Sequence, residues 1–173
     1  MKGRVDVRGT QGLVRALQKV GANADEALRS ALYIEAEQVM ALSKQEAPVG
    51  VDGQLRASGY VDLPKKEGTR IHVTMGYNAQ HALFVHEGTG PAVGKAPFFP
   101  PPSAFVQWVK KFLGASAKDA GTESDPGPTA WFVARAVGRR GLAPSKFLER
   151  PLKARLRGMA GRMAKRVRAG LKA

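Results

Sequence analysis

"TRIHVTMGY" (residues 69–77) is the stretch that decides the fold. Ile71, Val73 and Met75 recur at every second position, a period typical of a strand with one buried face. "PKKEG" (64–68) stands just before it and predicts a hairpin connection from an earlier strand over residues 55–63. The sequence therefore predicts a small antiparallel sheet.

A long amphipathic helix is predicted before this sheet, over residues 12–46. Gly21 and Asn23 indicate a break or kink, and Pro48 disfavours helical geometry at the residue before it. The apolar positions that recur at helical spacing are Leu13, Leu17, Val20, Leu28, Leu32, Ala36 and Val39.

Several shorter helices are predicted after the sheet. One begins at a Ser103 cap and ends at Gly114, and a second runs from Thr129 to Gly138 or Gly141. A basic amphipathic helix is predicted over about 151–172, whereas residues 115–128 are small and polar and are expected to form a mobile loop. This order predicts an α+β fold, with residues 1–173 as a single domain.

The charge of the chain is unusual for its length of 173 residues: 28 Lys and Arg against 14 Asp and Glu give a net charge of +14. Nine basic residues and no acidic one lie between Arg150 and Ala173. Such a segment is either a surface for nucleic acid or an acidic partner, or a solvated helix face. The N-terminus lacks the apolar core of a signal peptide and no apolar run approaches the roughly 20 residues of a membrane span, so we expect a soluble protein.

"EGTGPAVGKAPFFPPP" (87–102) suggests a phosphate-binding loop at first sight. The P-loop pattern requires glycine where Thr89 stands and a hydroxyl where Ala96 stands. Prolines follow in place of the helix whose amides would face the phosphates. We therefore expect no nucleotide and no other cofactor at this loop.

Other catalytic and metal-binding patterns are also lacking in the sequence. The chain has no cysteine, and His72, His81 and His86 do not have the spacing of a HExxH zinc site, so they are expected to be surface or interface histidines. No G-x-S-x-G elbow is found, and neither Glu35 nor Glu87 has a convincing catalytic partner. We expect a protein that is not an enzyme and holds no metal.

The aromatic residues divide into two groups. The first is expected to lie in the core on helical faces, and its members are Trp108, Phe112, Trp131 and Phe132. The second is the pair Phe98 and Phe99, followed by Pro100, Pro101 and Pro102. The proline rings hold the backbone in an extended conformation at little entropic cost. We call residues 98–102 the aromatic arm. It either docks onto a neighbouring surface or packs against its own chain as a loop, and the sequence leaves both interpretations open.

The order of these segments resembles the tail-completion, or head–tail joining (neck), proteins of tailed bacteriophages. The resemblance covers about residues 24–157 and is carried by "APVGVDGQLRASG" (47–59), "HALFVHEGTGP" (81–91), "FVQWVKKF" and "RRGLAPSKFLERPLKARL" (139–156). His81 departs from the usual tyrosine, and Pro151 interrupts the last block. The matching loop residues are Pro48, Gly53, Leu55, Arg56, Ser58, Glu87, Gly88, Thr89, Phe147 and Leu148.

The resemblance implies a structural virion protein without catalysis, present in the host cytoplasm during assembly and then in the neck. It implies a closed ring of roughly six or twelve copies, in contact with the portal or connector protein, the tail terminator or tail tube protein, and the packaged DNA in the channel, but with no membrane. The alternative is a free nucleic-acid-binding protein that uses the C-terminal helix. Expected contact residues are Phe98, Phe99, Pro100, Pro101, Pro102, Arg150, Lys153, Arg157, Arg162, Lys165 and Arg166.

Overall fold

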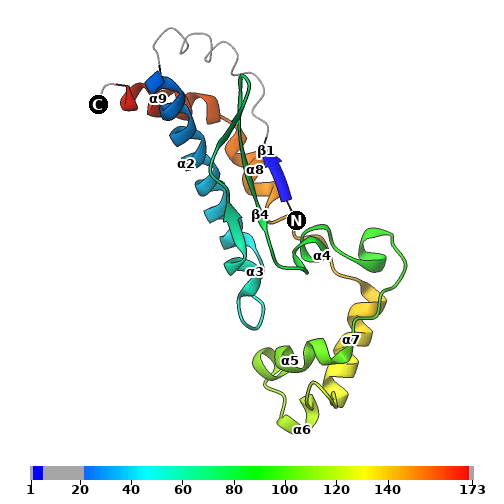
Figure 1. Ribbon diagram of the computed structural model, residues 1–173. Helices are drawn as coiled ribbons and strands as arrows, with labels where there is room; N and C mark the ends of the chain where they lie inside the picture. Colours follow the sequence, from blue (N-terminus) through cyan, green and yellow to red (C-terminus); the bar gives the residue numbers. More distant parts are fainter. Residues whose placement is uncertain (1, 6–21, 172–173) are drawn as a thin grey trace. The chain divides into compact units, whose positions relative to one another are not determined.

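Strand β4 (Arg70–Tyr77) lies at the centre of the sheet (Figure 1). It pairs antiparallel with β1 (Lys2–Val5), with β2 (Gly59–Val61) and, nearer its start, with β3 (Lys65–Glu67). The computed structural model describes residues 2–5 and 22–171. Of the residues predicted to share its buried face, Val73 and Met75 are at most 2% exposed and Ile71 is half-buried. His72 and Gly76 are buried as well, so the expected alternation of buried and exposed positions is only partly present. The α+β class is confirmed.

The predicted hairpin was wrong in two respects. The first strand of the hairpin begins at Gly59, not at residue 55, because Gln54–Ala57 forms the short helix α3. Lys65–Glu67 is strand β3 and not a connection, and Glu67 pairs directly with Arg70. The two-residue turn uses Gly68 at φ 59°, a positive angle that hairpin turns commonly assign to glycine.

Helix α2 (Ala22–Glu46) is the long helix that the sequence predicted, and it runs alongside the β2–β4 hairpin in Figure 1. Leu28, Leu32, Ala36 and Val39 are buried along one face, as their spacing predicts. Asn23 is the second residue of the helix, while the predicted part over residues 12–21, with Gly21 at the expected break, lies outside the described residues, so the break stays a prediction. The helix ends before Pro48 as expected, with Ala47 N donating to Ser43 O at 2.8 Å.

The predicted C-terminal helix is two helices, α8 (Glu149–Leu156) and α9 (Met159–Gly170). They separate at Gly158, whose φ of 73° lies outside the right-handed helical region. Both pack against α2, and Met159, Met163 and Val167 of α9 are buried. The predicted amphipathic character is therefore confirmed in α9, whereas in α8 the apolar Leu152 is half-buried and Leu156 is 45% exposed.

The remaining elements are short. They are α4 (Ala82–Glu87), the 3-10 turns η1 (Gly90–Val93) and η2 (Pro102–Phe105), and the helices α5 (Val106–Leu113), α6 (Ala117–Ala120) and α7 (Pro128–Arg140). Gly114 and Gly141 end α5 and α7 as predicted, but Ser103 lies inside η2 and is not the cap of α5. Helix α6 lies within the predicted mobile loop 115–128, whose mobility stays a prediction.

The chain divides into two compact units. The sheet unit consists of the described parts of Met1–Ala47, Ser58–Asn78 and Phe147–Ala173, and the helical unit consists of Pro48–Ala57 and Ala79–Lys146. The expectation of one neck domain over residues 1–173 concerns how these units work together and stays a prediction. Within the described residues, no helix has the length and apolar character needed to cross a membrane.

Tyr77 links three elements of the sheet unit. Its hydroxyl lies 2.7 Å from Ser43 Oγ on α2, and its ring meets the Phe147 ring edge-on at 4.9 Å. All three side chains are buried, so neither polar group of the Tyr77–Ser43 pair has ready access to water.

Tyr77→Phe is expected to lower the free energy of unfolding of the sheet unit by about 1–2 kcal/mol, because it leaves the Ser43 hydroxyl buried without this partner. Chemical denaturation followed by circular dichroism measures the loss. Tyr60→Phe on β2, where the side chain is half-buried, serves as the matched control. Equal losses in the two variants would contradict the prediction.

Candidate functional site

The loop Glu87–Gly88–Thr89, predicted from the family pattern, pairs with the segment that follows α7 in the helical unit. Thr89 N donates to Leu142 O at 2.9 Å, and Leu142 N donates to Thr89 O at 3.1 Å. Gly88 has φ 78°, and a Cβ there would lie 2.5 Å from Leu142 O. Only glycine fits this approach of two backbones, which gives the family motif a structural reason.

The Glu87 carboxylate is held by two neighbours. Lys146 Nζ forms an ion pair with Oε2, and His86 Nδ1 lies 2.8 Å from Oε1. The hydrogen bond from Lys146, followed by that from His86, lowers the pKa of Glu87 below its ordinary value. Lys146 itself has φ 51°, and its backbone N donates to His86 O, so the residues 142–146 are fixed against α4 at several points.

Two of the three histidines are not surface residues, contrary to expectation. His86 is 3% exposed and His72 is 7% exposed, whereas His81 is exposed. His86 is buried because α4 turns it toward the loop that Glu87 and Lys146 hold. His72 Nε2 lies 3.5 Å from Glu67 Oε1 across the β3–β4 pair, a contact that needed the hairpin register to be known.

The other predicted loop residues occupy several elements. Pro48 is exposed and Gly53 precedes α3, in which Leu55 is 3% exposed and Arg56 is half-buried. Ser58 belongs to the sheet unit, where its carbonyl accepts from Asn78 N at 3.1 Å. Phe147 and Leu148, also in the sheet unit, are buried at 0% and 3%. Pro48, Gly53, Leu55 and Arg56 thus belong to the helical unit, and the other three residues to the sheet unit.

The aromatic arm is exposed in the helical unit. Phe98 is 64% exposed and Phe99 is 57% exposed. The Phe99 ring lies over α7, since a Cβ on Gly138 would come within 2.2 Å of its Cδ1 atom. Phe99 thus packs in part as a loop residue, whereas Phe98 is mostly exposed, and docking of the arm onto a neighbouring surface stays a prediction.

Three of the four aromatic residues expected in the core lie at the surface instead. Phe112 is 45% exposed, Trp131 is 59% exposed and Phe132 is 74% exposed. The core of the helical unit consists of Val106, Val109, Ala120 and Ala130, with Trp108 among the half-buried residues around it. In α7 the buried positions are Ala130, Ala134 and Gly138, so Trp131 and Phe132 stand on the other side of the helix.

The predicted C-terminal contact residues separate into two groups. Arg162 and Arg166 turn inward and bind Glu35 within the sheet unit. The second group has exposed side chains and consists of Arg150, Lys153, Arg157 and Lys165. Lys153 forms an ion pair with Glu149 within α8. A contact with partner molecules stays a prediction for all of them.

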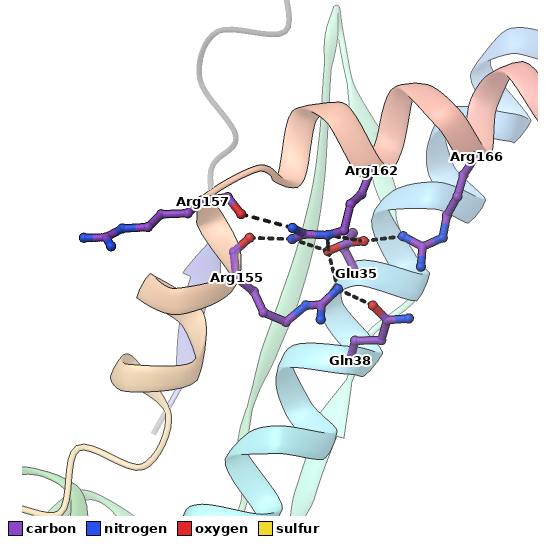
Figure 2. A network of polar contacts seen from close by, with 6 residues as sticks. All are labelled: Glu35, Gln38, Arg155, Arg157, Arg162 and Arg166. Carbon is purple, nitrogen blue, oxygen red and sulfur yellow. Dashed lines mark hydrogen bonds and ion pairs between the residues drawn. The ribbon is translucent and has the colours of Figure 1, made fainter.

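Glu35 on α2 binds three guanidinium groups, a cluster that the sequence did not predict (Figure 2). Arg155 Nη2 and Arg162 Nη2 each lie 2.9 Å from Oε2, and Arg166 Nη1 donates to Oε1. Arg162 also donates to the carbonyl oxygens of Arg155 and Arg157, at 2.5 and 3.0 Å. One side chain thereby joins α2 to the turn between α8 and α9.

The ionisation of Glu35 follows from its surroundings. Its side chain is 1% exposed, and burial by itself would raise the pKa. The hydrogen bonds from Arg162, Arg155 and Arg166 outweigh burial and lower the pKa of Glu35 to about 2. The carboxylate is therefore charged at neutral pH, and the three arginines leave two positive charges in excess.

One signal in the sequence was available for this cluster. Glu35 lies three residues after Leu32 and seven after Leu28, so it stands on the buried face of α2. A carboxylate in that position requires a cationic partner. Which of the many arginines provides it depends on how α8 and α9 pack, and the sequence does not show this.

The chemistry of these clusters is that of ion pairing and backbone fixation. Among the residues that the structure describes, there is no group of three or more His, Cys, Asp or Glu side chains that could hold a metal ion. Gly94 has a left-handed conformation and ends η1, with an extended segment after it rather than a helix.

Residues 11–88 match the model of the HK97-gp10-like family, described as "Bacteriophage HK97-gp10, putative tail-component". The resemblance to phage neck and tail-completion proteins is confirmed over this stretch. The HK97-gp10-like segment includes α2, the β2–β4 hairpin and the Glu87–Gly88 pair. It supports a structural virion protein rather than an enzyme. No curated protein and no solved structure gives a significant match to the chain.

Glu35→Gln is expected to lower the free energy of unfolding by about 2–3 kcal/mol at pH 7, because it leaves three half-buried guanidinium groups without their anion. Because the folded pKa of about 2 lies below the ordinary 4.5, the contribution is fully present above pH 4.5 and is lost as the pH falls toward 2. Denaturant titrations of the wild type and the variant from pH 7 to pH 2 measure how their difference in unfolding free energy decreases. Glu37→Gln, on the exposed face of the same helix, is the control, and an equal loss there would contradict the assignment.

Gly88→Ala is expected to cost about 2–4 kcal/mol, because the positive φ and the nearby Leu142 carbonyl both oppose a Cβ. Gly94→Ala, at φ 70° with open space around it, imposes only the backbone strain and provides the comparison. Thermal unfolding of the two variants measures the difference. A loss at Gly88 no larger than that at Gly94 would show that the contact with Leu142 is unimportant.

Proposed function

We propose that the protein is a component of the neck of a tailed bacteriophage, where copies of the chain form a ring that joins the DNA-filled head to the tail. The HK97-gp10-like match supports a structural role in the virion. The observation that carries the proposal further is the outward placement of large apolar side chains in the helical unit. The proposed partners of the protein are other copies of the chain, the portal or connector protein, and the tail terminator or tail tube protein.

The outer face of α7 has the composition of a protein contact. Trp131, Phe132, Arg135 and Arg139 are exposed and follow one another at helical spacing. Tryptophan and arginine are enriched among the residues that dominate binding energy at protein interfaces. We call these four residues the α7 face.

The aromatic arm provides a second contact of the same kind. Phe98 is presented by a proline-stiffened segment, so little conformational entropy is lost when the side chain is buried by a partner. An exposed ring on a stiff arm and an exposed tryptophan on a helix both favour protein–protein docking. Ring closure requires two different surfaces on each copy, and the helical unit offers both.

Imaging particles that lack this protein tests the proposal. The expected result is filled heads without attached tails, with recovery when the purified protein is added. Normal tailed particles in its absence would overturn the neck assignment. A protein that binds DNA but neither forms rings nor enters particles would support the free nucleic-acid-binding alternative instead.

Phe98→Ala is expected to reduce incorporation into particles at least tenfold while leaving stability unchanged, because the ring is exposed and buried only on assembly. Phe99→Ala is expected to reduce incorporation and also to lower stability, since that ring packs over Gly138. Lys95→Ala is the matched control from the same loop and should have little effect. Quantitative immunoblotting of purified particles measures incorporation, and a larger effect at Lys95 would contradict this account.

A further inference from the structure

We propose that the outer side of the sheet unit's last helix binds the phosphate backbone of duplex DNA. The residues are Lys165 and Arg168 on α9 and Arg157 at the end of α8, just before the turn into α9, and we call these three the α9 basic face. This inference deepens the proposed neck function by naming a partner for one surface, although DNA binding itself can be measured without any ring.

The helical geometry separates these cations from those that bind Glu35. Lys165 lies two residues from both Met163 and Val167, which are buried, so it stands on the opposite side of α9. Arg168 is exposed three residues further along. Figure 2 shows the Arg157 side chain pointing away from Glu35, while only its carbonyl oxygen takes part in the cluster.

Within the described residues, the side chains of Arg157, Lys165 and Arg168 form no ion pair with a carboxylate, although the first turn of α2, with Asp25 and Glu26, lies near the end of α9, where a Cβ on Gly170 would be 3.6 Å from Ala27 Cβ. The Glu35 carboxylate binds other arginines, Arg155, Arg162 and Arg166. That cluster keeps two positive charges in excess beneath the face. Eight basic residues and no acidic one lie between Arg150 and Leu171, so this segment itself contributes only positive charge.

The shape of the face favours DNA over an acidic protein. Gly161 lies one turn before Lys165 on the same side of α9, and a Cβ there would meet no atom within 4 Å; Ala169 is exposed next to Arg168. Small residues let a helix approach a phosphate backbone closely. Apart from Leu156, which is 45% exposed beside Arg157, the described residues 150–171 have no large exposed apolar side chain of the kind that anchors protein interfaces. The α7 face has such anchors, so the two surfaces suit different partners.

Fluorescence anisotropy with a 30-base-pair duplex of random sequence tests the inference on the full chain. Arg157→Ala/Lys165→Ala/Arg168→Ala is expected to weaken binding at least tenfold at about 0.1 M salt. It should also make the log–log salt slope shallower by about 2–3, since each phosphate contact contributes roughly 0.9. The exposed positions keep the variant folded, which circular dichroism checks, and Lys165→Glu alone should change binding in the same direction.

The matched control removes the same charge from the helical unit: Lys95→Ala/Lys118→Ala/Arg140→Ala, all exposed. Equal weakening in the two triple variants would show that net charge alone attracts DNA, and would overturn the inference. Polyglutamate that competes as well as DNA of equal charge would assign the face to an acidic protein and overturn it too. Rings that join heads to tails without DNA binding would refute this inference alone, whereas DNA binding without rings would refute only the neck function.

Discussion

The Glu35 carboxylate is the constraint on which the sheet unit depends. It lies within the buried face of α2, and three arginines from α8 and α9 bind it. Removing a carboxylate from water is costly, and the interaction with these arginines offsets that cost only if α8 and α9 take one position on α2. The cluster therefore fixes where the last two helices lie, while the methionine stripe of α9 provides apolar burial that is less specific about position.

Arg162 has a particular part in this arrangement. Its guanidinium binds Glu35 and two carbonyl oxygens at the end of α8, groups that a helix terminus leaves without intrahelical partners. Gly158 makes the turn, and Arg162 holds it. The inward arginines thus stabilise the packing of α8 and α9 on α2, whereas Arg150, Lys153, Arg157, Lys165 and Arg168 have exposed side chains.

The helical unit differs from the sheet unit in which side chains it buries. Its core is built from valine and alanine, and its largest apolar side chains lie outside. Large exposed apolar patches often mark contacts with other molecules, which agrees with the structural virion role that the family match supports. The HK97-gp10-like match ends at residue 88, so most of these rings lie beyond it and are understood from their exposure alone.

The sequence by itself determined the features that depend on local periodicity and backbone chemistry. These are the α+β class, the central strand β4, the buried stripe of α2, the glycines that end α5 and α7, and the EGT motif. Only the tertiary structure decided the rest: the division of the C-terminal arginines into inward and outward groups, the burial of His72 and His86, and the exposure of Trp131 and Phe132. An alternating or helical pattern tells which residues share a face, but whether that face meets a core, a carboxylate or water depends on packing against elements far away in the chain.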